Sequence, residues 1–175
     1  KTLKLAGAAK KVEHIVVDSE VEAFLLEASL IKKHRPYFNI SLSDDKFFPY
    51  LAIGEKPFPY VTITRRVQDK TARYFGPYTS ASDLKIVLKI LRRLFPYQSV
   101  KNHPKKQCLY YHLGLCPCIP VHQDNLKGYK KNVKDLILFL QGKKEDVIKS
   151  LRKEQKKFSR NEEFEKASDI QTKIQ

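Results

Sequence analysis

The segment from Asp18 to Pro36 constrains the fold most, because the sequence specifies both ends of a helix there. Ser19 followed three residues later by Glu22 forms a capping box, which marks the start of a helix. Basic residues fill the last turn, and Pro36 ends the helix. Apolar residues at helical spacing cover most of its surface, so the sequence predicts a helix that is mostly buried.

Glu27 lies in the middle of this helix, and its neighbours one turn away are Ala23, Phe24, Leu30 and Ile31. No lysine or arginine of the same helix can therefore pair with it. A carboxylate on an apolar surface needs compensation from elsewhere. Two explanations stay open: a salt bridge to a basic residue of another segment, or ligation of a hard divalent cation such as Mg²⁺.

Length, charge and hydropathy limit the class of protein. The 175 residues suffice for one ordinary domain or two small ones, and 42% hydrophobic residues are compatible with a packed core. The formal charge of +15 favours nucleic acid as the partner. We find no apolar run of membrane-spanning length and no signal peptide, so we expect a cytoplasmic protein without a membrane partner. The chain begins at Lys1 and contains no methionine, so we expect a piece of a longer protein.

Periodicity along the chain predicts an α+β fold. The amphipathic helix after Thr79 or Ser80 has a buried stripe and a basic outer face, and Pro96 ends it. Strands are expected at 12–17, 50–53, 60–67 and 73–78, with the middle two forming a hairpin. Helices are expected at 2–11, 19–35, 80–95, 132–141, 144–158 and 162–174, with a turn at 159–161 and Gly142 ending the fourth helix.

The irregular segment 99–123 holds all three cysteines of the chain, which are Cys108, Cys116 and Cys118. It also contains His103, His112 and His122. Without a fourth thiol or a paired CxxC the metal signal is weak, although one of these histidines could supply a ligand for zinc. Reduced thiols of a cytosolic protein are the simpler interpretation.

The last two helices are expected to form a hairpin with little apolar area. It either completes its core by docking on a partner helix pair or packs as a tail on its own chain. Arg65, Arg66 and Arg73 alternate with aromatic residues that could stack on bases, although such rings more often belong to the core.

Several stretches in order make the chain similar to the bacterial UvrC family, the nuclease subunits of nucleotide excision repair. They are DSEVEAFLLEASLIKKHRPYFNISLSDDKFFPYLAI, FPYVTITRRV, YFGPYTSA, CLYYHLGLCPC and NEEFEKASDIQTKI. The resemblance implies that residues 1–42 are the second half of a GIY-YIG nuclease domain. It makes Glu27 the metal-binding glutamate, with Asn39 as a supporting catalytic residue and Mg²⁺ or Mn²⁺ as the cofactor.

The resemblance also divides the rest of the chain. Residues 43–98 become a linking region, 99–131 a Cys/His loop and 132–175 a helical region with a UVR hairpin that meets UvrB. Partner contacts are expected from Phe158, Phe164, Ala167 and Ile170. Contacts to damaged double-stranded DNA are expected from Lys32, Lys33, Arg35, Arg65 and Arg66.

Two departures from the family pattern change these expectations. The GIY and YIG strands, with their tyrosines and catalytic arginine, would precede Lys1, so this piece is not expected to cut DNA alone. Family members tend to carry four cysteines in the loop, and some are thought to hold an iron–sulfur cluster. Here Val100 matches the first cysteine, and Cys116 and Cys118 are closer together than usual, so we predict no cluster on the incomplete set.

Overall fold

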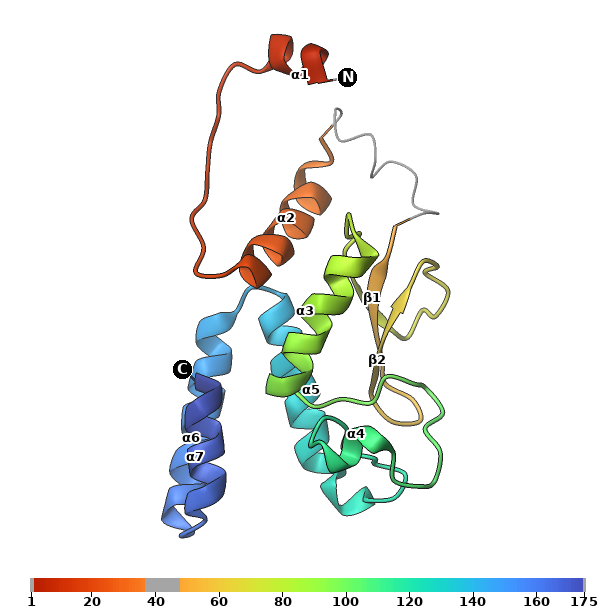
Figure 1. Ribbon diagram of the computed structural model, residues 1–175, viewed down its shortest axis with the longest axis vertical. Coiled ribbons are helices and arrows are strands. Elements are labelled where there is room, and N and C mark those ends of the chain that lie inside the picture. Colours follow the sequence, from red (N-terminus) through yellow and green to blue (C-terminus); the bar gives the residue numbers. More distant parts are fainter. Residues whose placement is uncertain (1, 37–47, 175) are drawn as a thin grey trace.

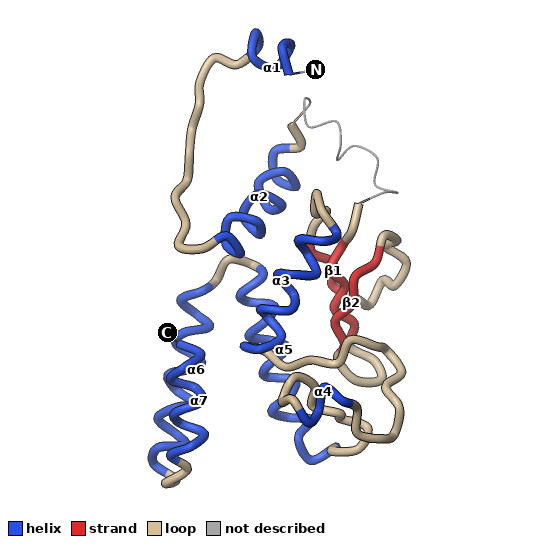
Figure 2. Tube along the Cα trace, in the orientation of Figure 1, coloured by secondary structure: helices blue, strands red, loops and turns tan. Residues whose placement is uncertain are grey.

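The computed structural model describes residues 2–36 and 48–174, and it has the predicted α+β fold (Figure 1). Its strands form one three-stranded sheet, and helices supply the rest of the regular structure (Figure 2). The elements are α1 Thr2–Ala8, α2 Glu20–His34, β1 Tyr50–Gly54, β2 Tyr60–Thr64, β3 Arg73–Phe75, α3 Ala81–Leu94, α4 Leu109–His112, η2 Gln123–Asn125, α5 Leu126–Leu140, α6 Lys144–Arg160 and α7 Phe164–Ile174.

The sheet confirms the predicted hairpin. Antiparallel β1 and β2 pair Leu51 with Ile63 and Ile53 with Val61, and β3 lies on the other side of β1. Strand β2 stops at Thr64, short of the predicted end, because the Thr64 hydroxyl accepts a hydrogen bond from the Arg66 backbone at 3.1 Å and closes a turn. The central strand β1 is buried almost throughout.

Helix α3 begins and ends where the sequence predicts. Ser80 caps it by accepting a hydrogen bond from the Asp83 backbone at 3.2 Å, and the helix ends just before Pro96. The predicted stripe is buried at Leu84, Val87, Leu88 and Leu91. These residues join the apolar side chains of β1, β2 and α5 in one core.

Helix α2 has the predicted caps, but the prediction that it is mostly buried is wrong. The Glu22 backbone donates to the Ser19 hydroxyl at 3.2 Å, and Arg35 ends the helix in a left-handed conformation with φ 42°. Among the described residues of α2, only Ala28 is fully buried. The helix packs along one side, where Phe24 stacks on Tyr78 at 5.1 Å between ring centroids.

The strand predicted at 12–17 does not form in the part of the chain that the structure describes. This stretch is an extended connection between α1 and α2 (Figure 1), and Val12 and Val16 are 89% and 85% exposed. A strand needs a neighbour for its backbone hydrogen bonds. None of the described residues pairs with this segment.

Helix α5 begins at Leu126, before the predicted position, because Tyr129 anchors its first turn. The buried Tyr129 hydroxyl donates to the Pro59 carbonyl at 2.6 Å and accepts from the Gln98 backbone at 3.1 Å. Helix α6 also extends further than predicted, so that Ser159 and Arg160 are helical and the turn begins at Asn161. Helices α6 and α7 then pack against each other, and α6 packs on α5.

Ion pairs link the start of α2 to the start of α6. Lys144, at the start of α6, lies 2.8 Å from carboxylate oxygens of both Asp18 and Glu22. No helix in the described ranges 2–36 and 48–174 has the length and apolar character needed to cross a membrane.

Candidate functional sites

Glu27 projects from the middle of α2 and is exposed. It makes no hydrogen bond or ion pair with the residues that the structure describes, so the salt-bridge explanation has no support there. One open carboxylate suits Mg²⁺, which binds through one or two carboxylates and keeps several waters. Asn39, the expected supporting residue, lies outside the described residues.

The basic residues expected to contact DNA lie on two elements. Lys32 and Lys33 are exposed in the last turn of α2, and Arg35 follows as its exposed C-cap. Arg65 and Arg66 are exposed in the loop after β2. Charge and exposure make all five accessible to a phosphate backbone.

A groove between β2 and α3 carries a further set of basic side chains, which we call the basic groove. Val61, Ile63 and Leu88 contribute apolar lining, and basic residues of α3 line it as well. These are Lys85, Lys89, Arg92 and Arg93. The sequence contains a signal for this basic surface: the i, i+4 spacing of Lys85 and Lys89 places both side chains on the same side of a helix.

Arg92 has a structural role in this groove, because its guanidinium is already bound by other residues of the chain. Its guanidinium donates to the Leu115 carbonyl at 2.9 Å and to the Tyr97 carbonyl at 3.1 Å. The same group lies 4.1 Å from the ring centroid of Tyr110 and 4.9 Å from that of Tyr97. Arg92 therefore ties α3 to the cysteine-containing loop, whereas Lys85 and Lys89 are exposed.

The loop between α3 and α5 gathers a Cys/His cluster, made of His103, Cys108, Cys116 and Cys118. Their donor atoms all lie within 4.8 Å of one another. Cys116 and Cys118 are buried, and His103 and Cys108 are half-buried. Of the three histidines considered from sequence, His103 is the one in the cluster.

His122 is engaged elsewhere in the same loop. Its ring nitrogen lies 3.1 Å from the Gln107 amide, and its ring stacks on Tyr111 at 4.7 Å. His112 is exposed in α4 and meets the edge of Tyr111. Sequence reasoning could not choose His103 because the loop has no periodicity that fixes which side chains converge.

The thiols of the cluster differ in acidity. Burial by itself raises the pKa of Cys108, but hydrogen bonds from His103, Cys118 and the Tyr111 backbone outweigh it and hold the pKa at about 7. Burial raises the pKa of Cys116 to about 12. The half-buried Cys108 is therefore the thiol of this pair that ionises more readily.

The α6–α7 hairpin presents one large apolar side chain to solvent. Phe164 is 65% exposed, whereas Ala167 and Ile170 are buried. Phe158 is half-buried, and the Lys166 ammonium lies 5.5 Å from its ring centroid. The hairpin therefore packs on its own chain in this structure and leaves Phe164 open.

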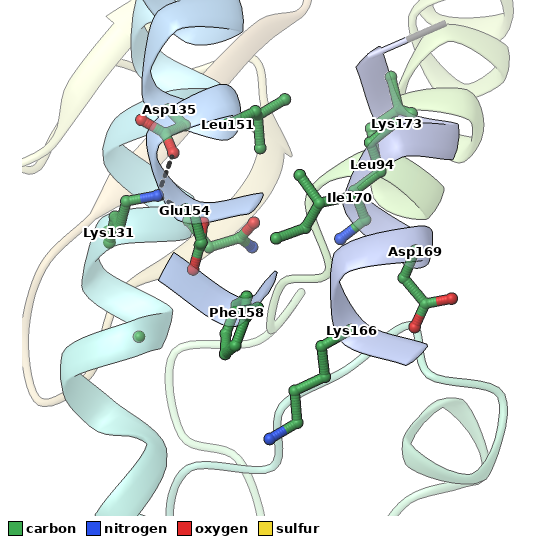
Figure 3. A pocket seen from close by; sticks show the side chains of 12 residues that line it. Leu94, Lys131, Asp135, Leu151, Glu154, Phe158, Lys166, Asp169, Ile170 and Lys173 are labelled. Atoms are coloured by element: carbon green, nitrogen blue, oxygen red, sulfur yellow. Dashed lines mark hydrogen bonds and ion pairs between the residues drawn. The ribbon is translucent and has the colours of Figure 1, made fainter. Parts of the chain in front are cut away.

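A cavity between the hairpin and α5 is lined by charged and apolar side chains from α5, α6 and α7 (Figure 3). Lys131 of α5 lies 3.3 Å from Asp135 and 2.6 Å from Glu154 of α6. Asp135 is 4% exposed, and the Ser150 hydroxyl donates to it at 3.2 Å. These contacts fasten the hairpin to the body.

Comparison with known proteins matches each of these regions to a family description. The model of the UvrC/Cho excinuclease middle domain matches residues 48–139, which is more than half of the chain. The chain belongs to the UvrC family. A UvrC-like GIY-YIG domain matches residues 1–40, and the UvrB/uvrC motif matches 145–175.

A curated member of the UvrC family gives the same result over nearly the whole chain. UvrABC system protein C of Desulfitobacterium hafniense (strain Y51) is 41% identical over 172 residues, which cover 97% of this chain and 28% of that protein. The chain therefore spans under a third of this relative's length. No solved structure matches this chain significantly.

The family segments coincide with the structural features. Glu27 and the basic end of α2 lie in the GIY-YIG segment, and the basic groove and the Cys/His cluster lie in the UvrC middle domain. The α6–α7 hairpin corresponds to the UvrB/uvrC motif. The cavity beside the hairpin spans two of the matched segments, because Lys131 lies in the middle domain and Glu154 in the UvrB/uvrC motif. The five basic residues expected to contact DNA are likewise divided between the GIY-YIG segment and the middle domain.

Proposed function

We propose that this chain is part of the nuclease subunit of bacterial nucleotide excision repair. That subunit incises damaged double-stranded DNA on the 3′ side of the lesion by metal-dependent phosphodiester hydrolysis. The observation that carries the proposal is Glu27, which is exposed, has no ion pair with the residues that the structure describes, and lies in the segment that matches a UvrC-like GIY-YIG domain.

Glu27 would hold the Mg²⁺ or Mn²⁺ ion, and Asn39 would support it. When bound, such a cation offsets the charge that develops on the scissile phosphate and the leaving oxygen. Lys32, Lys33 and Arg35 follow on the same helix end and would position the DNA backbone without reading its sequence. Arg65 and Arg66 would extend this contact.

The α6–α7 hairpin would dock on UvrB. Phe164 is the exposed aromatic anchor, and a single large side chain of this kind can dominate a small interface. Ala167 and Ile170 are buried within the hairpin, so we assign them the task of holding it in shape behind Phe164. Phe158, whose ring lies under the Lys166 ammonium, belongs to the same hairpin and is the fourth residue expected at the contact with UvrB.

For the 175-residue chain by itself, a second function is favoured: binding DNA and docking on a partner without cutting. The basic groove supports it, because Lys85 and Lys89 border apolar lining that could lie against a sugar-phosphate backbone. This groove would bind nucleic acid without using Glu27, which belongs to a different part of the sequence.

A nicking assay separates the two functions. The chain and a version extended at its N-terminus through the rest of the GIY-YIG domain are incubated with lesion-containing duplex, Mg²⁺ and UvrB. We expect both to bind DNA and only the extended protein to incise on the 3′ side. Incision by the chain alone, or none by an extended protein that binds DNA normally, would contradict the proposal.

Removing two charges from the basic groove should weaken DNA binding in a salt-dependent way. In Lys85→Ala/Lys89→Ala the slope of log affinity against log salt should fall by about 2, because each phosphate contact contributes about 0.9. Lys149→Ala/Lys153→Ala, on exposed positions of α6, changes the net charge equally and serves as the control. Equal slopes in the two variants would exclude the groove as the binding surface.

A further inference from the structure

Four of the distances between donor atoms of the Cys/His cluster match those of a single tetrahedral metal site, and the whole set lies within 4.8 Å. Sulfur to sulfur, Cys118 lies 3.5 Å from Cys108 and 3.8 Å from Cys116. The His103 Nε2 lies 3.7 Å from the Cys116 sulfur and 3.6 Å from the Cys118 sulfur. A zinc ion with bonds of about 2.3 Å to sulfur and about 2.0 Å to nitrogen requires separations of about 3.8 Å and about 3.5 Å between ligands.

His103 also has the orientation of a metal ligand. Its Nδ1 lies 2.9 Å from the Pro104 carbonyl oxygen. A carbonyl can only accept a hydrogen bond, so Nδ1 keeps its proton. Nε2, the nitrogen beside the sulfurs, is then the one that would give up its proton and bind the metal. Histidines that bind metals are typically held in this way, with the other ring nitrogen donating to a carbonyl or carboxylate.

The backbone around the last two thiols aims them at the same point. Cys116 and Cys118 flank a proline, and Cys118 has the left-handed φ of 42° that non-glycine residues seldom adopt. Both sulfurs lie beside His103. Surrounding contacts enforce it: the Cys108 backbone lies 3.5 Å from the Cys118 sulfur, and Ile119 donates to the buried Gln98 side chain at 3.1 Å.

The same spacing does not fit an iron–sulfur cluster, the alternative that the family resemblance raised. In a four-iron cluster each protein ligand binds a different iron at a corner of the cube, so the ligands surround a body of eight atoms. Their donor atoms must then lie much farther apart than the ligands of one ion. Four donors within 4.8 Å leave no room for that body.

We propose that His103, Cys108, Cys116 and Cys118 bind one zinc ion, with His103 completing a Cys₃His set in a chain that has three cysteines. Cys₃His is a common tetrahedral ligand set for structural zinc. All four positions are filled by protein, so the site is closed and its role is structural, not catalytic.

Zinc at this point would fix one wall of the basic groove. Tyr110 and Leu115 lie between Cys108 and Cys116 and line that groove. The Arg92 guanidinium contacts both, through the Tyr110 ring and the Leu115 carbonyl. None of the side chains of the short helix α4 is fully buried, so a metal would supply order there that apolar contacts do not.

Metal analysis of the unmutated chain tests the proposal directly. The chain is produced with both iron and zinc supplied and is purified without oxygen, so that an iron–sulfur cluster would survive. We expect about one zinc per chain, no iron or acid-labile sulfide, and no visible absorption. Iron with sulfide, or a folded chain with intact thiols that does not take up added zinc, would overturn the assignment.

Two histidine variants show whether His103 is the fourth ligand. His103→Ala should weaken zinc affinity by more than about 100-fold, because loss of outer-shell partners alone costs up to that much. His112→Ala removes an exposed histidine of the same loop and should retain full zinc affinity. Equal affinities would overturn the role of His103, and circular dichroism of both zinc-loaded proteins would verify that they are folded.

Discussion

Glu27→Gln is expected to abolish 3′ incision by the N-terminally extended protein while leaving its folding and its DNA affinity unchanged. Glutamine keeps the shape of the side chain and removes the charge that would hold the cation. Loss of a metal that supplies several kcal/mol of stabilisation to the reacting phosphate should lower the rate on the order of 1,000-fold. Stability should not change, because Glu27 is exposed and makes no ion pair with the described residues.

Glu20→Gln is the matched control for this experiment. Glu20 is an exposed glutamate in the first turn of the same helix, so the substitution makes the same change in charge at a position without a proposed role. Single-turnover incision of lesion-containing DNA should be normal in Glu20→Gln and lost in Glu27→Gln. Normal incision in both variants would show that Glu27 is not the metal ligand.

Lys131→Met should produce the largest loss of stability among the charge substitutions considered. It would leave the Asp135 carboxylate, whose side chain is 6% exposed, with only the Ser150 hydroxyl as a partner. Removing one partner of a buried pair costs about 3–5 kcal/mol. The Lys131 side chain is 41% exposed, so solvent reduces the expected cost to about 2–3 kcal/mol.

Two further variants make the Lys131 result specific. Lys130→Met alters the exposed neighbour on α5 and should change the free energy of unfolding by less than about 0.5 kcal/mol. Lys131→Met/Asp135→Leu also removes the buried carboxylate and should recover most of the loss, because the carboxylate that still lacks its partner, Glu154, is 32% exposed to solvent. Urea denaturation followed by circular dichroism measures all three. A loss in Lys131→Met no larger than in Lys130→Met would mean that the buried carboxylate does not need its partner.

Local chemistry made much of the fold predictable. Ser19 and Ser80 cap their helices through hydrogen bonds within the next turn, and Pro96 blocks continuation of α3. The apolar residues of β1 and the alternating residues at the start of β2, separated by a turn with Pro57, pair as a hairpin. These signals depend on residues close together in sequence, so no knowledge of the rest of the chain was needed.

The errors came from contacts between distant segments. The apolar residues 12–17 predicted a strand, but pairing depends on a neighbour that sequence periodicity cannot identify. Helix α2 is apolar on more than one side, and only packing decides which side is covered. The early start of α5 depends on Tyr129 reaching Pro59, and such long-range hydrogen bonds leave no local pattern.

The candidate sites also have one part that sequence spacing predicts and another that only the folded structure shows. The absence of a pairing partner for Glu27 within its own helix was visible from spacing alone, and its exposure was not. Three cysteines and three histidines in one loop indicated possible zinc ligands. Only the folded loop shows that His103, and neither His112 nor His122, faces the sulfurs, because an irregular segment has no fixed relation between sequence spacing and direction.

Direct titration of Mn²⁺ tests the proposed role of Glu27 without depending on catalysis. The N-terminally extended protein and its Glu27→Gln variant are titrated with Mn²⁺ in the presence of uncleavable duplex DNA, and the free ion is measured by electron paramagnetic resonance. We predict one Mn²⁺ site in the unmutated protein that is absent from the variant. Equal numbers of sites with equal affinities in the two proteins would contradict the assignment of Glu27 as the metal ligand.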